Sequence, residues 1–106
     1  MSVSLSSDLP CQELVEQLRD QQEMLRAHGI VSLSIFGSRA RGDNRWDSDL
    51  DLLVDYDRAR KFSLVDLVHV EHMIERMVGI EVQITTWASV PSATRARLAA
   101  DSVRVF

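Results

Sequence analysis

Apolar positions along the chain switch between helical spacing and strand spacing, and this alternation predicts the order of its elements. Near the N-terminus they keep the three- and four-residue spacing of a helix up to Gly29, a residue typical of helix ends. Ser7 or Asp8 is expected to cap this helix, with Pro10 tolerated in its first turn. The apolar residues of the helix are Leu14, Val15, Leu18, Met24 and Leu25.

Three further segments, 31–36, 50–54 and 80–86, are predicted to be strands. The first and the third alternate apolar and polar residues, which puts their apolar side chains on one face. These side chains are Val31, Leu33, Ile35, Ile80, Val82 and Ile84. Residues 103–106, VRVF, are expected to close the chain as a short edge strand.

A second long helix is predicted between the second and the third strand, over residues 63–78. Ser63 and Asp66 have the spacing of a capping box at its start, and Gly79 supplies a stop. A short helix over residues 91–100 follows the third strand. The order helix, strand, strand, helix, strand, helix predicts an α/β fold, a small mixed sheet flanked by helices. The apolar face of the long helix is expected to comprise Leu64, Leu67, Val68, Ile74, Met77 and Val78.

Composition agrees with one small domain spanning residues 1–106. The net charge of −4 argues against broad, direct binding to nucleic acid, which favours a basic surface. No apolar run has the length of a membrane span, and the first residues do not join a basic to an apolar region, so neither a membrane segment nor a secretory leader is expected. Cys11 is the only cysteine, which favours a reduced, cytoplasmic setting.

Two aspartates stand at the start of the second strand. Because side chains alternate along a strand, Asp49 and Asp51 lie on one face with Leu53, about 7 Å apart along the backbone. Two carboxylates at this spacing suit Mg²⁺, which prefers oxygen ligands and keeps positions for water or phosphate. The alternative is a polar strand end whose aspartates are solvated. The opposite face holds Leu50, Leu52 and Val54.

A glycine and a serine end the preceding strand. Gly37 allows a ligand to approach the backbone closely, and Ser38 adds a hydroxyl where free N–H groups of a helical turn would attract phosphate. Arg39 and Arg41 add positive charge. An isolated Gly-Ser pair is usually an ordinary turn. The end of one strand thus has features that suit phosphate, and the start of the next has features that suit a metal. Together they predict a site for a triphosphate with its metal.

Gly-Ser, ten residues and Asp-x-Asp resemble the signature of the DNA polymerase β-like nucleotidyltransferase superfamily. Residues 37–54, G-S-R-A-R-G-D-x-R-x-D-S-D-x-D-L-L-V, are similar to its smallest branch, the minimal nucleotidyltransferases of bacteria and archaea. The resemblance implies the polymerase β-like fold. It also implies that the triphosphate of ATP or another NTP binds at Gly37, Ser38 and Arg39, and that Asp49 and Asp51 are catalytic and bind Mg²⁺.

The sequence departs from this family at the third carboxylate. The family usually has an aspartate on the next strand, in a G-x-x-V-D-L-V setting, whereas Gln83 stands there in this chain. Glutamine carries no charge and is a poor general base. Glu81 lies two residues away on the same strand face, so either residue is a candidate to complete the metal site.

The resemblance also implies a partner. Minimal nucleotidyltransferases are often paired with a HEPN-type ribonuclease toxin, which they neutralise by transferring AMP from ATP to a tyrosine. The leading hypothesis is therefore an antitoxin that modifies such a toxin within a hetero-oligomer. The alternative, motivated by Gln83, is an antitoxin that neutralises the toxin by binding alone. Transfer to a small molecule such as an aminoglycoside is a third hypothesis.

Overall fold

A four-stranded mixed sheet organises the chain, which the computed structural model describes over residues 11–106. The caps predicted at Ser7 and Asp8, and Pro10, lie outside the described residues. The strands are β1 (Ile30–Phe36), β2 (Leu50–Tyr56), β3 (Val82–Thr86) and β4 (Val103–Arg104). The helices are α1 (Cys11–Asp20), α2 (Gln22–Ala27), α3 (Ser38–Arg41), α4 (Leu64–Val78), α5 (Ser92–Asp101) and the short 3₁₀ helix η2 (Trp87–Ser89).

The strands lie in the order β3-β2-β1-β4, so β3 and β4 form the two edges. β1 pairs antiparallel with both β2 and β4. β2 pairs parallel with β3, and α4 makes the crossover that this connection requires. The predicted α/β class, the mixed sheet and the terminal edge strand are confirmed.

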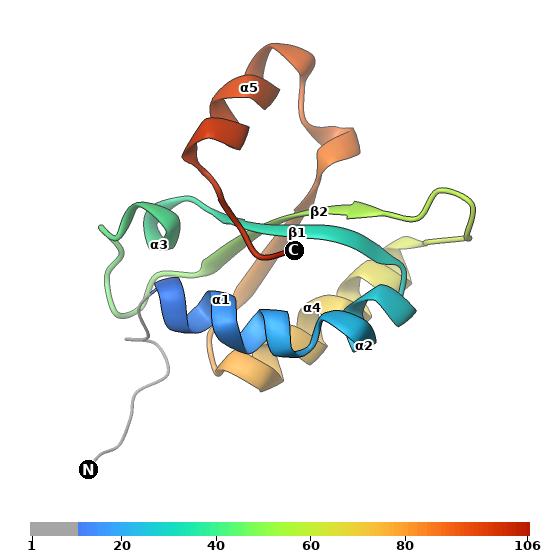
Figure 1. Cartoon of the computed structure of the whole chain (residues 1–106), viewed down its shortest axis with the longest axis horizontal. Coiled ribbons are helices and arrows are strands. Elements are labelled where there is room, and N and C mark those ends of the chain that lie inside the picture. The colour runs from blue at the N-terminus through green and yellow to red at the C-terminus, as the bar shows by residue number, and fades with distance from the viewer. Residues whose placement is uncertain (1–10) are drawn as a thin grey trace.

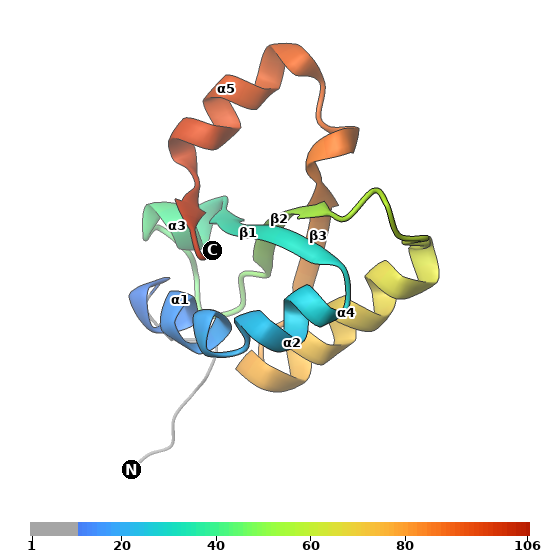
Figure 2. The same ribbon diagram turned by 45° about the vertical axis from the view of Figure 1, so that its right-hand side comes forward.

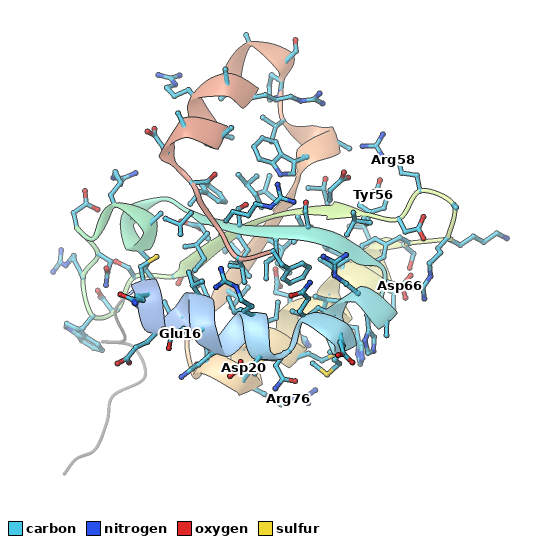
Figure 3. All side chains as sticks on the ribbon, viewed as in Figure 1. Glu16, Asp20, Tyr56, Arg58, Asp66 and Arg76 are labelled. Atoms are coloured by element: carbon cyan, nitrogen blue, oxygen red, sulfur yellow. The ribbon has the colours of Figure 1, made fainter. Side chains whose placement is uncertain are left out.

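One face of the sheet, called the inner face here, packs against α1, α2 and α4 (Figure 1). The first helices are amphipathic, and Glu16 and Asp20 of α1 point away from the sheet (Figure 3). Burying the apolar side chains between the two layers supplies the main stabilisation of the fold. The fully buried side chains of this core are Leu14, Leu18, Leu25, Ile35, Leu50, Leu52, Val54 and Ile74.

The opposite, outer face of the sheet carries mainly polar side chains. α5 arches over it, on the side away from α1, α2 and α4 (Figure 2). No residue of α5 is buried, so the helix stands off from the sheet instead of packing on it. Strand register places these side chains on the outer face: Ser32, Ser34, Phe36, Asp51, Leu53, Asp55, Gln83, Thr85 and Arg104.

The single N-terminal helix expected from the sequence is two helices. α1 ends at Asp20 and α2 begins at Gln22, because Gln21 leaves helical geometry with φ −101° and ψ 15°. Its N–H bonds the carbonyl of Leu18, three residues earlier. Neither glycine nor proline marks this break in the sequence. Across residues 11–106, none of the helices combines the length and the apolar character that crossing a membrane requires.

Val31 was expected on the buried face with Leu33 and Ile35, and this expectation is wrong. Leu33 and Ile35 are buried, but Val31 is 45% exposed and Ile30 takes its place in the core. The cause is an irregularity in the pairing of β1 with β2 between Ile30 and Ser32, which shifts the alternation by one residue.

The capping box predicted for α4 is confirmed. The Asp66 N–H donates to the Ser63 hydroxyl, and the Ser63 N–H donates to the Asp66 carboxylate over 2.8 Å. The Ser63 N–H and the Ser63 hydroxyl both donate to this carboxylate and hold the pKa of Asp66 below its ordinary value. Gly79 ends the helix in the left-handed conformation, at φ 71°. Sequence reasoning therefore located both ends of this helix.

The apolar face of α4 is narrower than predicted. Leu64 and Val68 were expected in the core, but Leu64 is 77% and Val68 46% exposed. With about 3.6 residues per turn, Val68 lies on nearly the opposite side of the helix from Val70, which is buried. The side chains of α4 that pack against the core are Leu67, Val70, Ile74, Met77 and Val78.

This orientation of α4 predicts a contrast between two truncations. Ile74→Ala should lower the free energy of unfolding by about 2–5 kcal/mol, because it leaves a cavity in the core. Leu64→Ala should change it by less than about 0.5 kcal/mol, because that side chain is exposed. Urea denaturation measures both values. Equal losses would show that α4 is rotated from the orientation described.

Candidate active site

The pairing of β1 with β2 brings the glycine–serine turn and the aspartates together. Phe36 pairs with Asp51, so Gly37 leaves β1 directly beside that carboxylate. Gly37 has φ 78° and ψ −153°, and a Cβ added to it would lie 2.6 Å from Oδ2 of Asp51. Only glycine fits this contact, since any side chain would be strained by the positive φ and would collide with the carboxylate.

Ser38 opens the single helical turn α3. The Gly37 carbonyl accepts from the Arg41 N–H, and the Ser38 carbonyl accepts from the N–H groups of Gly42 and Asp43. Within residues 11–106, the Ser38 hydroxyl forms no hydrogen bond to another residue. It is therefore available to a ligand beside Asp51.

Arg39 lies inside the loop between β1 and β2. Its side chain is 1% exposed, and its guanidinium donates to the Ser48 carbonyl over 3.1 Å from Nε and 2.7 Å from Nη2. Ser48 directly precedes Asp49, so this contact fixes the entry of the chain into β2. A contact of Arg39 with a triphosphate stays a prediction. Its role in holding the loop was missed, because it depends on the loop's path.

The remaining charges of the loop lie at the surface. Arg41 pairs with Asp43 over 3.1 Å, and Arg45 lies 3.9 Å from Asp47. All four side chains are more than half exposed, so these pairs contribute little to stability. Trp46, at 68% exposure, also projects into solvent.

The two aspartates repel each other. Partial burial raises the pKa of Asp51 above its ordinary value, and the negative charge of Asp49 raises it further. The two carboxylates are therefore close enough for the charge of Asp49 to disfavour ionisation of Asp51. A divalent cation between them would relieve this repulsion.

Gln83 lies directly beside the two aspartates, at the position where the family usually has its third carboxylate. It pairs with Asp51 in the parallel register, and its Nε2 donates to Oδ2 of Asp49 over 3.2 Å. Glu81 sits outside the strand, where its carbonyl accepts from the Leu50 N–H over 2.8 Å. The amide of Gln83 therefore orients Asp49, whereas completion of the metal site by Glu81 stays a prediction.

An open cleft of about 470 Å³ adjoins Asp49 at the free edge of β3. Two glutamates of α4 form its far wall and bond the strand edge. Glu75 accepts from the Val82 N–H over 2.9 Å, and Glu71 accepts from the Ile84 N–H over 3.3 Å. Sequence reasoning did not single out these two glutamates, because their partners are backbone groups of another element.

The ligands available to a metal are oxygen atoms, as Mg²⁺ requires. Asp49 and Asp51 supply carboxylates, and the Ser38 hydroxyl stands nearby beyond Gly37. No group of three or more histidine, cysteine or acidic side chains within residues 11–106 is arranged to hold a metal. The site therefore fits a cation that keeps several positions for water or for phosphate oxygens, which is the usual behaviour of Mg²⁺.

The contact between Gly37 and Asp51 predicts a difference between two glycines. Gly37→Ala and Gly42→Ala both place alanine at positive φ, 78° and 81°, and each should lose about 1–2 kcal/mol of stability. Only Gly37→Ala collides with Asp51, since a Cβ on Gly42 meets no atom within 4 Å. We expect Gly37→Ala alone to weaken Mn²⁺ binding, measured by electron paramagnetic resonance, by about tenfold or more. Equal Mn²⁺ affinity in the two variants would refute the contact.

The raised pKa of Asp51 predicts a stability gain on neutralising it. Ionisation of Asp51 costs more in the folded than in the unfolded chain, so this cost appears as pH rises above the ordinary value of 3.8. In the absence of divalent cations at pH 7, Asp51→Asn should therefore raise Tm above that of the wild type.

The gain in Tm of Asp51→Asn over the wild type should shrink below pH 3.8, where Asp51 is protonated in both the folded and the unfolded chain. Asp43→Asn, an exposed control in the loop before β2, should leave Tm nearly unchanged. Thermal denaturation followed by circular dichroism measures these values. A fall in Tm for Asp51→Asn at pH 7 would contradict the proposed repulsion.

Comparisons with known proteins identify the family. Residues 11–105 match the family described as nucleotidyltransferase domain. A candidate protein adenylyltransferase of Methanocaldococcus jannaschii is 35% identical over 83 residues, which cover 78% of this chain and 87% of that protein. Protein adenylyltransferase MntA of Thermococcus cleftensis is 31% identical over 72 residues, which cover 68% of this chain and 71% of that protein.

Solved structures agree with this assignment. A candidate minimal nucleotidyltransferase has a TM-score of 0.76 at 28% identity, covering 91% of this chain and 96% of that chain. A chain of the tri-AMPylated Shewanella oneidensis HEPN toxin in complex with MNT antitoxin shares the fold, with a TM-score of 0.62 at 12% identity over 91% of this chain and 71% of that one. This chain therefore belongs to the minimal nucleotidyltransferases of the nucleotidyltransferase domain family.

Proposed function

We propose that this protein is a Mg²⁺-dependent protein adenylyltransferase that transfers AMP from ATP to a HEPN-type ribonuclease toxin and thereby neutralises it. The observation that carries this proposal is the contact of the Gly37 backbone with the Asp51 carboxylate. It puts a turn suited to phosphate within a few ångströms of carboxylates suited to a metal. A nucleoside triphosphate on this turn would bring its Mg²⁺ against the carboxylates.

The proposed reaction forms a bond between an acceptor hydroxyl oxygen and the α-phosphorus of ATP. The bond from that phosphorus to the oxygen shared with the β-phosphorus breaks, pyrophosphate leaves with the electron pair of that bond, and the proton of the acceptor hydroxyl passes to water. Ser38 would hold the triphosphate through its hydroxyl, and Asp49 and Asp51 would hold Mg²⁺, with Gln83 orienting Asp49. Mg²⁺ would supply electrostatic stabilisation of the charge that develops on the phosphate oxygens.

The names of the relatives support the choice of reaction, since two of them are described as protein adenylyltransferases. The fold neighbours support the choice of partner, since they include a HEPN toxin in complex with an MNT antitoxin and a toxin–antitoxin structure with AMP-PNP. The proposal therefore includes ATP as the nucleotide and a hetero-oligomer with the toxin. The cytoplasmic setting predicted from the lone Cys11 is part of it.

A second candidate function is neutralisation by binding alone. Gln83 motivates it, because the amide brings no charge to the position beside Asp49 and Asp51. An antitoxin of this kind would form the complex and block the toxin without transferring AMP. The two candidates differ in whether neutralisation depends on the two aspartates.

An AMP-transfer assay tests the proposal. The protein, labelled ATP, Mg²⁺ and a HEPN-type toxin sought in the neighbouring reading frame are combined, and label on the toxin is measured together with its ribonuclease activity. We expect the wild type to transfer label and Asp49→Asn/Asp51→Asn to lose about 100-fold or more of the rate. Asp43→Asn/Asp47→Asn makes the same change of charge at exposed positions of the same loop and should keep the rate.

The same variants separate the two candidates. Loss of neutralisation by Asp49→Asn/Asp51→Asn, with the complex still formed in gel filtration, would exclude binding alone. Full neutralisation by that variant, with no label transferred by the wild type, would exclude the catalytic proposal.

A further inference from the structure

The outer face of the sheet carries a cavity beneath α5 that the proposed reaction leaves unassigned. Two adjoining lobes have volumes of about 340 Å³ and about 540 Å³ and share Ser32, Trp87 and Ala99 in their walls. The smaller lobe is bounded by the sheet below and by the end of α5 above. Arg58 lies at the far end of the larger lobe, near the end of β2 (Figure 3).

The wall of the smaller lobe includes a buried hydroxyl without a partner. Ser34 is 9% exposed, and within residues 11–106 its hydroxyl forms no hydrogen bond to any residue. Ser102, in the same lobe, differs because its hydroxyl donates to the Ala99 carbonyl over 3.0 Å. Buried hydroxyls are nearly always hydrogen-bonded, so Ser34 is expected to bond a molecule in this cavity.

The wall that both lobes share presents an indole ring. Trp87 belongs to η2, and Arg95 of α5 fixes that segment. The Nε of Arg95 donates to the Val90 carbonyl over 3.2 Å, and the Nη2 of Arg95 donates to the Trp87 carbonyl over 3.3 Å. The wall and the helix above it thus hold each other in place. An aromatic ring in such a wall can stack on a flat heterocycle, with little preference for which base it is.

The cavity lies on the same face of the sheet as Asp51, further along β1 from the candidate active site. Asp51 pairs with Phe36, and Ser34 lies two residues further along β1 on the same face. At about 3.3 Å per residue, Ser34 lies about 7 Å along the strand from the level of Asp51, and Ser32 about 13 Å. This is the span that separates the phosphates of a nucleotide from its sugar and base.

We propose that the cavity beneath α5 binds the nucleoside part of the donor nucleotide, an inference that rests on the proposed function. The base stacks on Trp87, and the Ser34 hydroxyl bonds the sugar or the base edge. The triphosphate remains at Gly37 and Ser38, beside Asp51. Ala99 leaves room for the nucleoside because its side chain is small.

Fluorescence of Trp87 tests this proposal directly. Trp46→Phe removes the only other tryptophan, which is exposed, and leaves Trp87 as the sole reporter. In this background ATP with Mg²⁺ and adenosine alone should both change the Trp87 emission. Inorganic pyrophosphate with Mg²⁺ should bind, as measured by calorimetry, without changing it.

Two substitutions then probe the cavity. Ala99→Leu fills it from the helix and should weaken ATP and adenosine binding about tenfold or more, while pyrophosphate affinity stays unchanged. Ala100→Leu is the matched control, since it lies on the same helix, is exposed and does not line either lobe. Ser34→Ala should raise Tm, because it removes an unpartnered buried hydroxyl, and should still weaken ATP binding.

The outcomes separate this inference from the proposed function. If Ala99→Leu binds both pyrophosphate and ATP as tightly as the wild type does, the nucleoside site is overturned and the proposed function still stands. Equal weakening by Ala99→Leu and Ala100→Leu would also overturn it, as a general effect on the helix. Weaker binding of the toxin but not of ATP would assign the cavity to the acceptor. Absence of both ATP and pyrophosphate binding in Mg²⁺ would overturn both proposals.

Discussion

The close approach of one backbone to one carboxylate determines the geometry of the site. The register of β1 with β2 leaves room for only a hydrogen atom between Gly37 and Asp51. The turn must therefore leave the strand in a conformation that glycine alone adopts easily, and α3 starts there. The guanidinium of Arg39, in α3, donates to the Ser48 carbonyl and so fixes the end of the loop just before Asp49. The turn, loop and strand start are thus one connected unit.

The two faces of the sheet have separate roles. The inner face holds the apolar side chains that stabilise the fold, and the outer face holds the polar groups of the site. Because side chains alternate along a strand, neighbouring residues of β2 serve both roles: Leu50 and Leu52 lie in the core, and Asp51 lies between them on the other side. The packing of Leu50 and Leu52 in the core therefore fixes the backbone that carries Asp51.

The order of the elements, the capping box and the meeting of the turn with the aspartates were predictable, because each depends on short-range spacing. Apart from the local break at Gln21, the features missed depend on contacts between distant segments. Val31 leaves the core through an irregularity that exists only in its pairing with β2. The burial of Arg39 depends on the path of the loop, and the bond from Gln83 to Asp49 depends on strand register. The hollow beneath α5 follows from a helix without buried residues, which periodicity alone does not reveal.

The glutamates that bond the free edge of β3 also limit the growth of the sheet. An exposed strand edge offers its N–H groups to any other strand, including one from another copy of the chain. Glu71 and Glu75 accept hydrogen bonds from the N–H groups of Ile84 and Val82. Side chains of α4 therefore satisfy two of the edge groups with which a fifth strand would otherwise pair. A protein that approaches the aspartates from this side therefore meets a closed edge. It must make its contacts through side chains, not by extending the sheet.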